Sequence, residues 1–169
     1  MAHLIGLGNE NDKTALPLAT AQGTRIPNSR RGELAPEQMR EAVRIVLENH
    51  EQRILRSMSS VYNCFGMAFG GRRTCIEPEH VPMILREDGY LEVEQAASVM
   101  TGDIVIYEYE GEISHVAVVI SNEPDLMNAD SNLLVMSQWG SHGECLHDYR
   151  DVHYSFGKPV RFYSERRRI

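Results

Sequence analysis

The strand pattern of this chain is clearest in GDIVIYEYEGEISHVAVVIS, residues 102–121. It contains two runs rich in valine, isoleucine and tyrosine, which are residue types enriched in β-strands. Glu110, Gly111 and Glu112 separate the two runs. A short polar break that contains glycine is typical of a hairpin turn. The stretch therefore predicts two antiparallel strands joined around residue 111.

Further strands are predicted after this hairpin. A third strand is expected at residues 132–140, which read NLLVMSQWG, and a last strand at residues 158–164, which read KPVRFYS. Both runs combine β-branched or aromatic residues with a glycine or polar boundary. The second half of the chain is therefore predicted to be mainly antiparallel β-structure.

Besides the short helix that contains Cys64, two helices are predicted before the hairpin. The longer covers residues 35–58, where apolar side chains recur at three- and four-residue spacings and so share one helix face: Met39, Val43, Val46, Leu47, Ile54 and Met58. Its first turn contains Pro36 and Glu37, which suit the start of a helix. The shorter covers residues 78–90 and ends at Gly89.

Helices followed by antiparallel strands define an α+β fold, with the N-terminal helices packed on an antiparallel sheet. The 169 residues are long enough for one domain with a core of its own. Residues 1–34 lack periodic hydrophobicity and are rich in polar and turn-forming types, so they predict an irregular or partly mobile arm. The folded domain is expected to cover residues 35–169.

The composition of the chain limits which kinds of partner and which cellular compartment are expected. The net charge of −7 gives no general support for nucleic-acid binding, and no segment has the apolar length of a membrane span. The N-terminal sequence has no secretory signal, and three cysteines without tight spacing fit a reducing compartment. We therefore expect no nucleic-acid or membrane partner, and a cytoplasmic protein or one secreted without a signal peptide.

The first candidate for chemistry is Cys64, within SSVYNCFGMAFGG, residues 59–71. Val61, Phe65, Ala68 and Phe69 share a helical face, which places Cys64 in the first turn of a short helix. Unpaired backbone N–H groups at a helix start stabilise a thiolate. The alternative is that Cys64 is a small buried hydrophobic residue, as free cysteines often are.

The second candidate is His115, which begins the apolar run SHVAVVI. Strand alternation places His115, Ala117 and Val119 on one face, and Val116, Val118 and Ile120 on the other. The small side chain of Ala117 leaves room for a helix on the face of His115. A cysteine at a helix start that faces a strand histidine is the geometry of cysteine–histidine catalysis; the alternative is a structural histidine.

These pieces together resemble the papain-like cysteine hydrolase superfamily, and in particular its NlpC-type and CHAP-like branch. The resemblance rests on NCFGMAF as a cysteine helix, VMTGDIVIYEY as a Gly-Asp strand and ISHVAVVI as a histidine strand. It covers residues 60–163, and SQWG is similar to a Ser-Lys-Trp-Gly segment of relatives that have a Tyr-Asn-Cys opening. It implies a papain-like catalytic domain over residues 35–169, with Cys64 as nucleophile and His115 as base.

The resemblance also implies a third polar residue that orients the histidine ring. Chain order favours Gln138, whose amide oxygen can accept the ring N–H, over its neighbour Ser137; His147 and Asp130 remain open.

Oxyanion stabilisation is expected from the backbone N–H of Cys64 or Phe65, helped by the side chain of Asn63 or Tyr62. Cell-wall hydrolases of this branch commonly have DCSG where this chain has NCFG. The substrate implied by the resemblance is therefore either peptidoglycan or a protein.

Two other parts of the sequence contain side chains capable of metal binding or thiol chemistry. The stretch SHGECLHDYRDVH, residues 141–153, holds metal-capable side chains at spacings that match no zinc pattern, so a polar loop over the cleft is expected rather than a metal site. Cys75 follows Arg72 and Arg73, which could activate a thiol, but it lacks a helix start and is expected to be a loop cysteine.

The resulting hypothesis is a cysteine hydrolase, a peptidase or amidase, that needs no cofactor and acts on a peptide or amide substrate. A bacterial effector or toxin would fit, with a cognate inhibitor or immunity protein as partner. The alternatives are a glutamine deamidase or acyl transferase on the same site, and an inactive papain-like binding module. The discriminating feature is a polar atom within about 3.2 Å of the ring nitrogen of His115 that faces away from Cys64.

Overall fold

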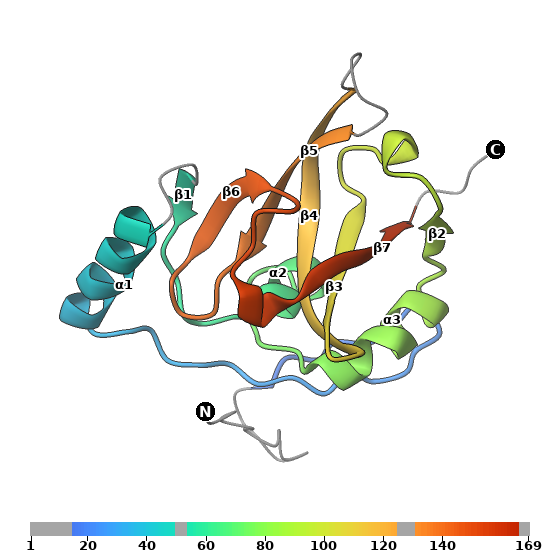
Figure 1. Ribbon diagram of the computed structural model, residues 1–169. Coiled ribbons are helices and arrows are strands. Elements are labelled where there is room, and N and C mark those ends of the chain that lie inside the picture. Colours follow the sequence, from blue (N-terminus) through green and yellow to red (C-terminus); the bar gives the residue numbers. More distant parts are fainter. Residues whose placement is uncertain (1–14, 50–53, 125–130, 166–169) are drawn as a thin grey trace.

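A computed structural model describes residues 15–49, 54–124 and 131–165 of the chain (Figure 1). Its described part is built on one seven-stranded antiparallel sheet with the order β1-β6-β5-β4-β3-β7-β2. The strands are β1 (Ile54–Ser57), β2 (Leu91–Val93), β3 (Ile104–Tyr109), β4 (Glu112–Pro124), β5 (Ser131–Gln138), β6 (Glu144–Asp148) and β7 (Lys158–Ser164). The α-helices are α1 (Pro36–Asn49), α2 (Cys64–Phe69) and α3 (Val81–Glu87), and short 3₁₀ helices cover Pro78–His80, Ala96–Ser98 and Tyr154–Phe156. The predicted α+β class is confirmed.

The hairpin at the centre of the sheet forms where the sequence predicts it. β3 and β4 pair antiparallel and are joined at Glu110 and Gly111, which have φ angles of 53° and 85°. Two positive φ values in a two-residue connection give the twist that paired strands require. The strands predicted at residues 132–140 and 158–164 correspond to β5 and β7, which pair with β4 and β3 respectively.

The sheet is covered on both faces, so its strands contribute alternately to two cores. On one face, Ile106 and Val116 pack with Cys64 of α2 and Leu85 of α3. On the opposite face, a second core is formed by Val105, Tyr107, Ala117, Val119, Leu133 and Val135, with Tyr149 and Val152 packed against it. We call these the helix face and the loop face of the sheet.

The long helix predicted over residues 35–58 is wrong at its C-terminal end. α1 ends at Asn49, and Ile54–Ser57 forms the edge strand β1, which pairs with β6. Leu55 packs near Trp139 and Cys145, so this apolar segment is buried through a sheet edge instead of a helix face. In Figure 1, α1 lies at the end of the sheet that β1 forms. Residues 50–53 of the predicted helix lie outside the described residues.

The shorter predicted helix is present as α3, and Gly89, with a φ of 75°, follows its end. Residues 15–34 contain no helix and only isolated bridges, Ala19 with Arg25 and Ser29 with Cys75. Ile26 from this segment is 3% exposed and joins the core that contains Cys64. The irregular segment therefore shares a core with the rest of the chain; residues 1–14 lie outside the described part.

Candidate functional site

Cys64 is the first residue of α2, as predicted, and Asn63 caps the helix. The Oδ1 atom of Asn63 accepts hydrogen bonds from the backbone N–H of Gly66 (2.8 Å) and of Ile76 (3.1 Å), and its Nδ2 donates to the carbonyl of Ile76 (2.7 Å). These bonds satisfy a helix-start donor and tie α2 to the following loop. The Asn63 side chain is thereby held in a capping role, with its oxygen and nitrogen both engaged.

The position of α2 also depends on Gly66. A Cβ atom at this residue would lie 1.6 Å from the carbonyl oxygen of Thr74, which is far inside contact distance. The absence of a side chain lets the loop that contains Thr74 cross directly over the helix. This close approach closes the core around Cys64.

The thiol of Cys64 is buried and neutral. Its side chain packs with Val116 and Ile106 on the helix face, and the residue is 7% exposed. Burial raises the pKa of Cys64 to about 12, although backbone hydrogen bonds from Val116, Phe65 and Cys64 itself act in the opposite direction. The desolvation of the thiolate outweighs the favourable helix start.

His115 lies on the loop face, and it is fully buried. Its ring stacks on Phe156, with the ring centroids 4.2 Å apart and 16° between the planes, and it meets the edge of Tyr107 at 5.3 Å. Neither ring nitrogen has a hydrogen-bond partner among the described residues. Burial first, and then the neighbouring His147, lower the pKa of His115 to about 3, so the imidazole is neutral.

The structure therefore places Cys64 and His115 on opposite faces of the sheet. Val116 packs with Cys64, and the side chains of consecutive strand residues point to opposite sides. Tyr107, which pairs with His115 in the β3–β4 ladder, belongs to the loop-face core. The predicted facing of the cysteine and the histidine is not found, because the alternation turns Val116 towards α2.

Gln138, the predicted third residue, lies away from His115. Its Nε2 donates to the backbone carbonyls of Ser59 (2.7 Å) and Gly140 (2.8 Å), and the residue is 1% exposed. It pairs with Glu144 across β5 and β6. These contacts fix the loop before α2 to the end of β5, which is a structural role.

Ser137 and His147, two of the alternatives, contact each other. The Oγ of Ser137 lies 2.8 Å from Nε2 of His147, and Nδ1 of His147 lies 2.8 Å from the carbonyl oxygen of Asp148. Because Nδ1 faces a carbonyl it carries the proton, so Nε2 accepts the hydroxyl proton of Ser137. The indole N–H of Trp139 donates to the same hydroxyl oxygen at 2.9 Å.

This serine–histidine pair has the connectivity of a nucleophile and its base. It is nevertheless closed off, because Ser137 is fully buried, His147 is 1% exposed and Trp139 covers both. Its hydrogen bonds satisfy buried polar atoms of β5 and β6, which supports a structural role. The fourth alternative, Asp130, lies outside the described residues.

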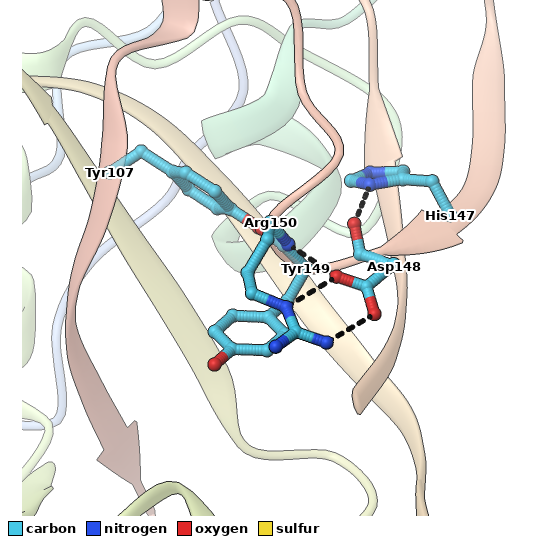
Figure 2. A network of polar contacts seen from close by, with 5 residues as sticks. All are labelled: Tyr107, His147, Asp148, Tyr149 and Arg150. Carbon is cyan, nitrogen blue, oxygen red and sulfur yellow. Dashed lines mark hydrogen bonds and ion pairs between the residues drawn. The ribbon is translucent and has the colours of Figure 1, made fainter. Parts of the chain in front are cut away.

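The loop after β6 is fixed by polar contacts that continue from His147. Figure 2 shows Arg150 against the carboxylate of Asp148 and the phenol of Tyr107 directed at the Tyr149 backbone. Nε of Arg150 donates to Oδ1 of Asp148 at 3.1 Å, and Nη2 donates to Oδ2 at 3.2 Å. Tyr107 donates to the carbonyl of Tyr149 at 2.8 Å. These bonds hold the segment that ends at Phe156 over the loop face, and Phe156 covers His115.

Tyr62 takes part in a buried ion-pair network that the sequence pattern does not reveal. Its hydroxyl donates to Oε1 of Glu144 at 2.8 Å, and Nε of Arg72 reaches the same oxygen at 2.5 Å. Burial first, and then Glu144, raise the pKa of Tyr62 to about 12. Glu144 is 4% exposed, so Tyr62 and Arg72 compensate a buried carboxylate and Tyr62 is not available as an oxyanion donor.

The remaining metal and thiol candidates are dispersed or buried. Within residues 15–49, 54–124 and 131–165, no three His, Cys, Asp or Glu side chains are placed to hold a metal ion. Cys75 is 2% exposed, and its thiol donates to the carbonyl of Val61 at 3.6 Å. Burial raises its pKa, as it does for Cys64.

No protein-family model, curated protein or solved structure matches this chain. In the described part of the chain, no helix has the length and hydrophobicity needed to cross a membrane.

Proposed function

We propose that the chain is a papain-like module that binds a peptide or protein ligand without hydrolysing it. The observation that carries this proposal is the separation of Cys64 and His115 by the sheet. Thiol catalysis needs a base within hydrogen-bond reach of the nucleophile. His115 instead contacts Phe156 and Tyr107 on the loop face.

The order of elements supports the papain-like part of the proposal. A helix that begins with a cysteine packs on an antiparallel sheet, and the Gly-Asp strand β3 precedes the histidine strand β4. Asp103 itself is 2% exposed, and its Oδ2 accepts from the backbone N–H of Met100 at 2.8 Å. The sequence features behind the resemblance thus occupy structural positions in the core.

The protonation states support the non-catalytic part. A working cysteine–histidine pair holds a thiolate beside an imidazolium or transfers the proton readily. Burial raises the pKa of Cys64 to about 12 and lowers that of His115 to about 3, which favours the two neutral forms. The criterion of a polar atom on the far ring nitrogen of His115 is also unmet among the described residues.

Alkylation by iodoacetamide, followed for each cysteine by peptide mass spectrometry across pH, tests this proposal. We expect Cys64, Cys75 and Cys145 of the folded protein all to be protected at neutral pH, since all three are buried. His115→Phe retains a ring between Phe156 and Tyr107 and should leave that protection unchanged. A Cys64 that reacts well below the ordinary thiol pKa of about 8.5, and only when His115 is present, would establish the hydrolase instead.

A further inference from the structure

A pocket of about 280 Å³ opens on the helix face between α3, β3, β4 and β7. Leu85, Ile106 and Ile113 give it an apolar wall, and two of these belong to the core that contains Cys64. Its volume is near the lower end of the range for small-molecule sites, so it suits one amino-acid side chain rather than a large ligand. The pocket is therefore shaped for an apolar anchor residue.

Two arginines stand at the pocket, and no acidic residue lines it. Arg86 extends from α3 and Arg161 from β7, and both residues are exposed. Arg86 contacts Glu87 at 3.1 Å, while Arg161 contacts Glu108 of the neighbouring strand. A guanidinium has five N–H donors, so each arginine retains donors for a further carboxylate.

The aromatic side of the pocket is formed by Tyr90 and Tyr163. Tyr90 packs edge-on against Phe69 with ring centroids 6.0 Å apart, and Tyr163 completes this side. Burial first, and then Glu165 and Asp88, raise the pKa of Tyr90 to about 12. A ligand that fills the pocket would place its apolar part against the tyrosines and an anionic group at Arg86 and Arg161.

We propose that this pocket binds the C-terminal residue of a peptide that ends in a large apolar side chain. The side chain fills the space against Leu85, Ile106 and Ile113, and the terminal carboxylate is held by Arg86 and Arg161. This inference rests on the proposed function, because it names the ligand of a module that binds without cleaving. Exposed guanidinium groups beside an apolar wall suit a free C-terminus better than an internal segment, because an internal segment has no terminal carboxylate.

N-acetyl-phenylalanine and its C-terminal amide are matched probes that differ only in the carboxylate. Each probe is titrated into ¹⁵N-labelled protein, and ¹H–¹⁵N correlation spectra are recorded. The amide resonances of the residues that line the pocket should shift. We expect the acid to bind at least about tenfold more tightly than the amide, because charge-assisted hydrogen bonds to the arginines are lost with the amide. Equal binding of acid and amide, shifts confined to another surface, or no shifts at all would overturn the proposal.

Arginine variants give a second readout. Arg86→Gln combined with Arg161→Gln should weaken binding of the acid at least about tenfold and leave binding of the amide nearly unchanged. Arg150→Gln is the matched control, since Arg150 is also an exposed arginine that contacts a carboxylate but lies outside the pocket. Loss of acid binding in the control as well, or its retention in the double variant, would count against the two arginines.

The same spectra separate this inference from the proposed function. Release of free N-acetyl-phenylalanine from the amide would show hydrolysis and overturn the non-catalytic proposal, while selective binding of the acid would leave the pocket intact. If neither hydrolysis nor binding is seen, the proposed ligand of the pocket is wrong, and the non-catalytic proposal is unaffected.

Discussion

The ring of His115 stacks on Phe156 at a centroid distance of 4.2 Å and an interplanar angle of 16°. The contact joins the central strand β4 to the 3₁₀ helix Tyr154–Phe156, and it buries an imidazole whose two nitrogens lack hydrogen-bond partners among the described residues. A histidine used in this way is an apolar ring as long as it is neutral. Protonation would place an uncompensated charge in the core beside His147.

His115 should therefore make folding sensitive to mild acid. Its pKa is lowered from 6.5 to about 3, so its contribution to stability is complete above pH 6.5 and is lost as the pH falls towards 3. We expect about 1.4 kcal/mol of unfolding free energy to be lost per pH unit below 6.5 from this group. Urea unfolding at pH 7, 6 and 5 measures the loss, and the difference between the chain and His115→Phe isolates it from other groups. Parallel pH dependence in both proteins would contradict the buried neutral imidazole.

Gly66 should not tolerate even one added methyl group. Gly66→Ala would place Cβ 1.6 Å from the carbonyl oxygen of Thr74, and the contact is backbone, which cannot rotate away. We expect a loss of about 3 kcal/mol or more in unfolding free energy, the upper range for overpacking. Gly32→Ala is the control, because a Cβ there meets nothing within 4 Å and the backbone is not in the left-handed region. Chemical denaturation of the two variants should differ by this amount, and similar stabilities would show that the loop does not cross α2 as described.

Arg72 should matter for stability although its side chain is half exposed. It contacts Glu144, whose side chain is 5% exposed, so Arg72→Leu leaves a buried carboxylate that still accepts a hydrogen bond from Tyr62 but has lost its contact with the guanidinium. We expect a cost of about 2–4 kcal/mol, because removing one member of a buried pair leaves the other uncompensated.

Arg44→Leu provides the contrast, since its contacts with Glu41 and Glu48 on α1 are exposed on both sides and exposed ion pairs contribute about 0–1 kcal/mol. In thermal and urea unfolding, Arg72→Leu should be clearly less stable than Arg44→Leu. Equal losses would argue that Glu144 is hydrated rather than dependent on Arg72.

Much of the fold follows from local sequence patterns. The β3–β4 hairpin, β5, β7, α3 and the start of α2 at Cys64 all lie where propensity and turn residues predict them. The prediction was wrong at the C-terminal end of the long helix, because Ile54 and Leu55 suit a buried helix face and a sheet edge equally well. Pairing with β6 decided between the two, and that pairing is a non-local contact.

The candidate site was less predictable for a related reason. Alternation correctly separated His115 and Ala117 from Val116 and Val118 on β4. It could not determine which set faces α2, because both faces of this sheet are buried and both sets are largely apolar. Likewise, the contact between Ser137 and His147 depends on the register of β5 with β6, which the intervening turn sets and the strand composition does not.

If Cys64 and His115 do not act as a catalytic pair, the charge of the His115 ring does not depend on Cys64. Long-range ¹H–¹⁵N spectra of the imidazole, recorded across pH in the unaltered chain and in Cys64→Ala, report the charge of that ring. We expect a neutral His115 from pH 8 to pH 5 in both proteins, because burial lowers its pKa to about 3. An imidazolium at neutral pH that becomes neutral when Cys64 is replaced would instead show that the two residues form a thiolate–imidazolium pair.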